Sequence, residues 1–211
     1  MLSSTQSRIE SLLTMIDKLG MAKIRHLQLT HDLKSYSNAC RVVKQLSPYI
    51  NETMFEREKV LYLNKEGREL IGSTKEMKKN SLMEHTLLGN EVYFYFNCPI
   101  DWKTEYTIEK EPLNTHGILF GGMTLVKQRI VADACFTRNG YLHLIEVDNT
   151  RSMVDNRKKI EAYADVLTEL KKKAMPILCV FTTNKERKRK FEDWMKKKNI
   201  RGEVKTFDEI K

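Results

Sequence analysis

Three acidic residues, Asp133, Glu146 and Asp148, have the spacing of a metal site built on a β-hairpin. Asn139 and Gly140 lie between two segments of strand-like composition, and this pair is typical of a type I′ hairpin turn. A turn centred there sets Asp133 directly opposite Glu146. Asp148 points to the same face, because side chains alternate along a strand. Facing carboxylates repel each other unless a cation lies between them. We therefore expect Asp133, Glu146 and Asp148 to bind Mg²⁺ or Mn²⁺.

The segments that must position these carboxylates indicate a mixed α/β domain. Residues 141–148 and the continuous apolar run 177–181 are expected strands, and a helix at about 154–173 joins them. Strand, helix and strand in this order predict a parallel βαβ crossover. The other expected elements are a helix over 81–96, strands over 102–109 and 129–136, a loop at 117–122, a helix over 185–198 and an edge strand at 204–207.

Residues 1–75 predict a winged helix-turn-helix domain. An apolar stripe of helical spacing predicts a first helix that ends at Gly20, and Ser35 or Ser37 can cap the third helix. A hairpin of strands 49–50 and 60–63, joined by residues 51–59, and a closing helix over 64–71 complete the expected order. In this fold the third helix enters the major groove of DNA. The residues expected to face double-stranded DNA are Lys34, Tyr36, Ser37, Asn38, Arg41 and Lys44 on the helix and Arg57 and Lys59 on the wing.

A polar segment, residues 73–80, separates this domain from a second one at residues 81–211. The expected fold class is therefore α+β or α/β, with an N-terminal winged helix followed by a mixed-sheet domain. The net charge of +9 resolves into +4 over residues 1–85, −3 over 86–150 and +8 over 151–211. A metal-dependent nuclease needs such an acidic centre between basic segments, although ordinary scatter explains the value of −3 equally well.

The composition argues against several classes of protein. A chain of 41% hydrophobic and 31% charged residues is typical of a globular protein, and no apolar run approaches the roughly 18 residues that span a membrane. The first residues lack the layout of a signal peptide. The four cysteines lie far apart without a C-x-x-C pair, which argues against a zinc ribbon or a disulfide scaffold. We expect a cytoplasmic protein without a membrane partner.

The predicted hairpin and crossover resemble the PD-(D/E)XK nuclease fold, in which an Asp and a Glu-x-Lys lie on adjacent strands. Asp133 matches the Asp, Glu146 matches the Glu, and Glu91 matches a Glu that some members carry on the first helix. Over nearly the whole chain the sequence more specifically resembles the replication-relaxation proteins of Gram-positive plasmids and related mobile elements. The motifs that carry this resemblance are residues 60–63, 67–68, 85–91, 132–134, 144–148 and 159–163.

The resemblance implies metal-dependent cleavage or nicking of DNA, with Asp133, Glu146 and either Glu91 or Asp148 holding the cation. Asp148 occupies the position that the nuclease pattern gives to a lysine. Lys159 on the following helix is then the lysine expected to assist the nucleophile, with Lys158 as the second choice.

Three functions follow from these residues, and two of them involve DNA. The first is a DNA endonuclease or nickase of plasmid or phage replication. The second is a non-cleaving replication or transcription regulator that keeps the nuclease-like domain as a scaffold or dimerisation surface. A module that binds protein instead of DNA is a third, since winged helices do both. Winged helices often bind DNA as dimers, which adds a homodimer to the expected partners.

Overall fold

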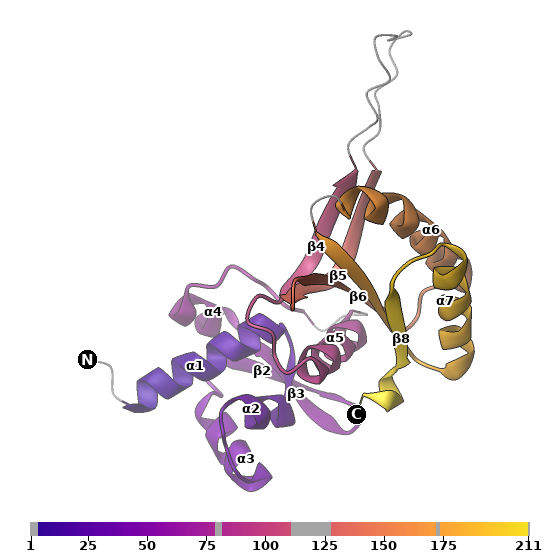
Figure 1. The fold of residues 1–211 in the computed structure, drawn as a ribbon. Helices are drawn as coiled ribbons and strands as arrows, with labels where there is room; N and C mark the ends of the chain where they lie inside the picture. The colour runs from indigo at the N-terminus through magenta and orange to yellow at the C-terminus, as the bar shows by residue number, and fades with distance from the viewer. Residues whose placement is uncertain (1–3, 79–81, 111–127, 172–173, 211) are drawn as a thin grey trace. The chain divides into compact units, whose positions relative to one another are not determined.

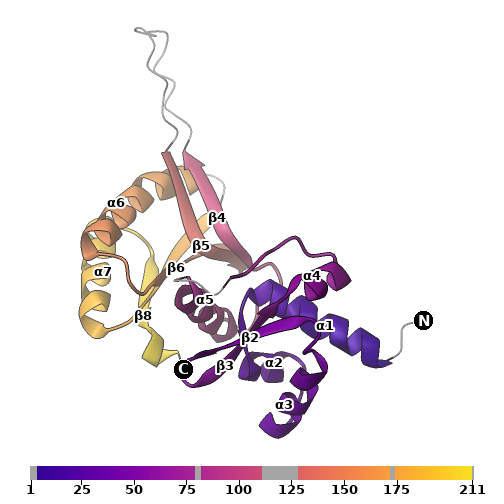
Figure 2. The ribbon, with the colours of Figure 1, turned by 180° about the vertical axis from the view of Figure 1, so that it is seen from behind.

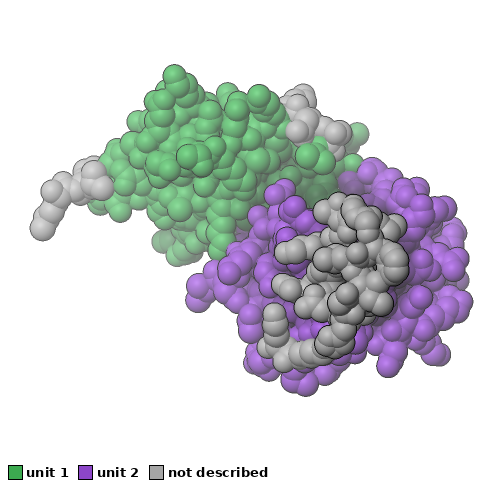
Figure 3. Space-filling model, turned by 90° about the horizontal axis from the view of Figure 1, so that it is seen from above, with its two compact units in different colours: residues 1–90 green, residues 91–211 purple. Residues whose placement is uncertain are grey.

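The computed structural model describes residues 4–78, 82–110, 128–171 and 174–210 (Figure 1). The chain forms two compact units, residues 1–90 and 91–211, which Figure 3 distinguishes by colour. The division falls inside helix α5 (Met83–Tyr95), whereas the sequence places the boundary at the polar segment before it. The expected loop at 117–122 and the end of the expected linker lie outside the described residues.

The first unit combines helices with a three-stranded antiparallel sheet of order β1-β3-β2. Polar side chains cap two of the helices at their N-termini: Ser35 before α3 and Asn64 before α4 each accept a backbone N–H. The elements in chain order are α1 (Ser4–Leu19), β1 (Ala22–Lys23), α2 (Ile24–Thr30), α3 (Tyr36–Gln45), β2 (Ile50–Phe55), β3 (Glu58–Leu63) and α4 (Lys65–Ile71).

Helix α1 is amphipathic as predicted, and it buries Leu12, Leu13, Ile16 and Leu19. Gly20 follows with a φ of 72°, a left-handed conformation that ends the helix and favours glycine. The first helix and its end are therefore confirmed. The two-residue strand β1 was not predicted, because two residues carry no readable periodicity.

The hairpin of the first unit is longer than predicted and has a tight turn. Strands β2 and β3 pair from Ile50 opposite Leu63 to Phe55 opposite Glu58, so only Glu56 and Arg57 form the turn. Both turn residues have positive φ, as a type I′ turn requires. Most of β2 beyond Ile50 is exposed or half-buried, and a strand without a buried face shows no hydrophobic alternation in its sequence.

The second unit contains a five-stranded mixed sheet of order β4-β5-β6-β7-β8. Strands β4, β5 and β6 pair antiparallel, and β6, β7 and β8 pair parallel. The predicted mixed sheet and parallel crossover are confirmed. The elements are β4 (Lys103–Lys110), β5 (Gln128–Arg138), β6 (Tyr141–Asp148), α6 (Met153–Leu170), β7 (Met175–Thr182), α7 (Lys185–Lys197), β8 (Gly202–Thr206) and a 3₁₀ turn, η1 (Phe207–Glu209).

Helices α6 and α7 lie side by side along one face of this sheet, as Figures 1 and 2 show. Their buried side chains, including Ile160, Leu167 and Phe191, share a core with Leu144 and Val180 of the sheet. Side chains alternate along β7, so Phe181 faces away from that core and packs against the ring of Phe96 on the other face of the sheet. The long helix α6 is thereby fixed over β6, the strand that carries Glu146 and Asp148.

In the described parts of the chain, no helix combines the length and the apolar character that crossing a membrane requires.

Candidate functional site

The hairpin between β5 and β6 has the predicted turn and the predicted register. Asn139 and Gly140 have φ values of 53° and 79°, which is the left-handed pair of a type I′ turn. The strands pair up to Ala134 opposite Ile145, and one further step sets Asp133 opposite Glu146. At this step the Asp133 Oδ2 accepts the backbone N–H of Val147, with an N–O distance of 2.7 Å. The Asp133 side chain is therefore fixed beside β6.

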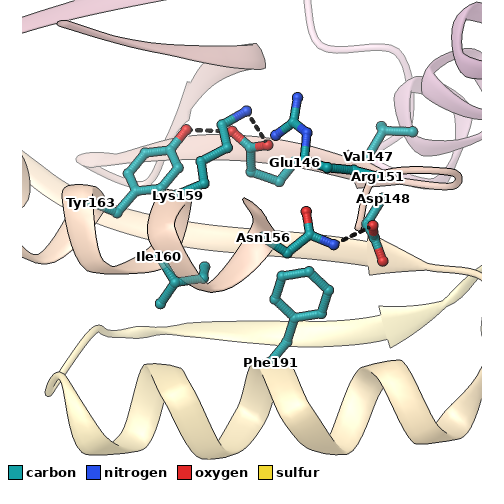
Figure 4. Close-up of a pocket in the computed structure, with 9 residues that line it drawn as sticks. All are labelled: Glu146, Val147, Asp148, Arg151, Asn156, Lys159, Ile160, Tyr163 and Phe191. Carbon is teal, nitrogen blue, oxygen red and sulfur yellow. Dashed lines mark hydrogen bonds and ion pairs between the residues drawn. The ribbon is translucent and has the colours of Figure 1, made fainter. Parts of the chain in front are cut away.

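Glu146 is buried, with 6% of its surface exposed, and two side chains of α6 contact its carboxylate. The Tyr163 hydroxyl donates to Oε1 at 2.5 Å, and the Lys159 Nζ donates to Oε2 at 2.5 Å. Lys159 and Tyr163 lie one helical turn apart, so both point toward β6 (Figure 4). The structure thus brings together Asp133, Glu146 and Lys159, three of the residues that the nuclease resemblance assigns to the site.

The surroundings of Glu146 favour its protonated form. Burial and, after it, the negative charge of Asp133 raise its pKa to about 7, although Lys159 and Tyr163 act in the opposite direction. Burial likewise raises the pKa of Tyr163 well above its ordinary value, and the Glu146 charge adds to this effect. A buried carboxyl group that titrates near neutrality beside a second carboxylate is a common property of functional sites.

Asp148 occupies a different environment from the Asp133–Glu146 pair. The Arg187 guanidinium donates to Asp148 through Nε at 2.7 Å and through Nη2 at 2.5 Å. Asn156 Nδ2 and Thr182 Oγ1 also donate to Asp148, at 2.7 and 2.6 Å. Across the described ranges no three acidic, histidine or cysteine side chains are placed to share a metal ion. The predicted convergence of Asp148 with Asp133 and Glu146 is therefore not found, because Arg187 neutralises Asp148 at the end of β6.

Glu91, the other carboxylate that the resemblance suggests, lies half-buried on α5. It is not among the residues that line the pocket around Glu146. The fallback lysine, Lys158, is exposed on α6, whereas its neighbour Lys159 is the one that contacts Glu146.

Of the residues expected to contact DNA from the third helix, Lys34 lies before the helix and its N-cap, and the others lie on the solvent face of the helix, except one. Asn38 is half-buried, donates to the Leu33 carbonyl at 3.0 Å and accepts from Arg41 at 2.8 Å. Ser35 is the N-cap, which settles the choice between Ser35 and Ser37. The exposed members are Lys34, Tyr36, Ser37, Arg41 and Lys44.

The two wing residues, Arg57 and Lys59, differ in how freely their side chains could contact DNA. Arg57 is exposed at the tip of the hairpin. Lys59 is half-buried, and its Nζ forms an ion pair with Glu52 at 2.5 Å on the paired strand. A surface pair of this kind contributes little stability and leaves Lys59 able to exchange partners.

Three features of the site were not predicted. Tyr163 was expected only in the core. Its place in an apolar stripe predicts a buried ring but does not predict the hydrogen-bond partner of its hydroxyl group. Arg187 was one of several basic residues of a helix, and its partner lies 39 positions away in the chain. Arg151 lines the pocket together with Glu146, Lys159 and Tyr163. A basic residue three positions after a strand that carries two acids is the sequence signal that points to it.

Comparisons with known proteins identify no family and no curated relative, and they find a solved structure of low similarity. No model of a protein family matches the chain, and no curated protein matches it. Among solved structures the chain is similar to the crystal structure of protein VC1899 from Vibrio cholerae, at 14% sequence identity and a TM-score of 0.41. The similarity covers 98% of this chain and 48% of that one, so this chain spans about half the length of that protein.

Proposed function

We propose that this chain is a DNA-binding protein whose second unit hydrolyses a phosphodiester bond with the help of a divalent cation. The observation that carries the proposal is the Lys159–Glu146 contact at 2.5 Å beside Asp133. The nuclease pattern needs two carboxylates and a lysine, and here the lysine comes from the helix after the strand. A lysine that reaches the carboxylate from another element supplies the same group as one placed two residues after it.

The donor set fits Mg²⁺ or Mn²⁺. Magnesium keeps several water ligands and is commonly bound through one or two carboxylates together with the phosphates of a substrate. Asp133 and Glu146 would hold the ion, since each carboxylate oxygen that accepts one hydrogen bond retains a second lone pair. When bound, the ion supplies charge stabilisation at the phosphoryl oxygens and a more acidic water molecule.

The residues of the chain divide the remaining tasks. Lys159, as a cation at hydrogen-bond distance from Glu146, stabilises the ionised carboxylate and can orient a water molecule toward the phosphorus. Tyr163 fixes the other oxygen of Glu146, which holds the carboxylate in one orientation. Asp148 belongs to the scaffold of the site, because Arg187 binds it in a bidentate pair.

The first unit supports DNA as the partner. Its order, three helices, a hairpin and a closing helix with a short strand after α1, agrees with the order expected of a winged helix-turn-helix and so supports this interpretation. The exposed face of α3 carries Tyr36, Arg41 and Lys44, which suits the phosphates and base edges of a major groove. These features and the motifs of the sequence support the proposal that the chain is related to the replication-relaxation proteins of plasmids or related elements.

One specific observation favours a second function, a regulator that binds DNA without cutting it. Asp148 stands where the nuclease pattern has its lysine, and it is held by Arg187 in a buried ion pair. A domain that keeps the Asp148–Arg187 pair for stability alone would retain the fold without the ability to cleave DNA.

Cleavage of DNA separates the two functions. Supercoiled and linear DNA are incubated with the full chain in Mn²⁺, in Mg²⁺ and in a chelator. The Asp133→Ala variant is compared with Asp165→Ala, which removes an exposed carboxylate from α6. The proposal expects metal-dependent nicking or cutting that Asp133→Ala abolishes and Asp165→Ala retains. DNA binding without cleavage in either metal would support the regulator instead.

A further inference from the structure

The loop between β6 and α6 presents an arginine beside the Glu146–Lys159 pair. Arg151 lines the same pocket as Glu146, Lys159 and Tyr163. In Figure 4 its guanidinium points toward the end of the pocket where the Lys159 amine meets the Glu146 carboxylate. Burial and the Glu146 charge raise the pKa of Tyr163. The positive charge of Arg151 lowers the same pKa and so opposes these two effects. The guanidinium therefore lies within electrostatic range of the site.

Among the residues that the structure describes, Arg151 differs from the neighbouring arginines in having no acidic partner. Arg157 on α6 forms an ion pair with Glu161 at 3.1 Å, and Arg187 is bound by Asp148. Within the part of the chain that the structure describes, no carboxylate forms an ion pair with the Arg151 side chain, which is exposed. A guanidinium without a partner next to a reactive cluster is available to an anionic ligand.

The backbone of Arg151 is nevertheless fixed. Arg187 Nη2 donates to the Arg151 carbonyl oxygen at 2.7 Å, and Arg187 is itself oriented by Asp148. The next residue, Ser152, caps α6 by accepting the Asp155 N–H at 3.1 Å. The loop is held at the Arg151 carbonyl and at the following residue, so the side chain of Arg151 extends from a defined position. Such preorganisation reduces the entropy that a binding residue loses when the ligand arrives.

We propose that Arg151 binds a phosphate of the nucleic-acid backbone beside the Glu146–Lys159 pair. The planar guanidinium donates two parallel N–H groups, which match two oxygens of one phosphate. The Asp148–Arg187 pair, which takes the place of the lysine in the nuclease pattern, then serves to position this phosphate-binding loop. The inference rests on the proposed function and names the residue that receives the substrate there.

The salt dependence of DNA binding tests this role without any cleavage. The affinity of the full chain for a DNA duplex is measured in chelator over a range of salt concentrations, for wild type, Arg151→Ala and Arg157→Ala. Each phosphate contact contributes about 0.9 to the slope of log affinity against log salt. We expect Arg151→Ala to reduce the slope by about one contact and Arg157→Ala to leave it unchanged. Arg151 holds its loop only through its backbone, so the substitution retains the Arg187 contact.

The outcomes separate this inference from the function on which it rests. A slope that Arg151→Ala leaves unchanged, or that both variants reduce equally, overturns the role of Arg151 while the proposed function stands. Failure of the wild type to bind any duplex overturns the proposed function itself. A parallel calorimetric titration uses inorganic phosphate and a mononucleotide. Arg151-dependent binding of these small anions with an unchanged duplex slope would identify a free phosphate as the ligand and refute a nucleic-acid backbone.

Discussion

The buried carboxyl group of Glu146 should contribute a defined pH dependence to the stability of the protein. Burial beside Asp133 raises its pKa from 4.5 to about 7. Between these two values the folded protein retains a proton that the unfolded chain has released, so the free energy of unfolding falls as the pH rises. The contribution of the neutral carboxyl group is fully present below the unfolded pKa and is lost as the pH rises through about 7.

The magnitude follows from the shift in pKa. A rise from 4.5 to about 7 corresponds to about 3 kcal/mol of destabilisation when Glu146 is fully ionised. Most of this change, about 2.5 kcal/mol, should occur between about pH 5 and about pH 8. Glu146→Gln removes the titration, so the free energy of unfolding of wild type should fall by this amount relative to the variant.

Urea denaturation across this pH range, in chelator, measures the effect. The control is Glu192→Gln, an exposed glutamate of α7, for which the difference from wild type should stay constant with pH. Parallel pH profiles for wild type and Glu146→Gln would refute the reasoning, because they would mean that Lys159 and Tyr163 offset the burial of the carboxylate completely.

Three further predictions concern the scaffold and the first unit. Arg187→Met should lower the free energy of unfolding in urea by about 3 kcal/mol because it leaves the Asp148 carboxylate buried without its cation, and a loss below about 1 kcal/mol would contradict this account. Gly67→Ala should cost about 1 to 3 kcal/mol in the same assay, since a Cβ there would lie 2.1 Å from the Tyr49 carbonyl oxygen; an unchanged midpoint would argue against this packing. Lys44→Ala should reduce the salt slope of duplex binding by about one contact, and an unchanged slope would remove α3 from the DNA interface.

The site could be predicted from the sequence where local periodicity determines it. The Asn139–Gly140 turn fixes the register of the hairpin, and the register sets Asp133 opposite Glu146. Helical spacing from Tyr163 identifies Lys159 as the inward lysine. Both inferences need only the geometry of one hairpin or one helix.

The rest of the site depends on contacts between distant residues, which periodicity does not encode. The alternation of β6 gives Asp148 the same parity as Glu146, but its partner Arg187 comes from α7. Whether an acid faces a metal site or an arginine is decided by the packing of α7 against the sheet. The role of Arg151 depends in turn on that ion pair, so it became visible only in three dimensions.

The central claim is that Asp133, Glu146 and Lys159 form a phosphodiester-cleaving site. The most direct measurement is the rate of metal-dependent cleavage of supercoiled DNA by wild type, Lys159→Met and Lys158→Met. The two variants remove the same charge from adjacent positions of α6, and only Lys159 contacts Glu146. The account predicts a loss of about 100-fold or more for Lys159→Met and an unchanged rate for Lys158→Met. Equal rates for the two variants, or no cleavage by wild type in either metal, would contradict it.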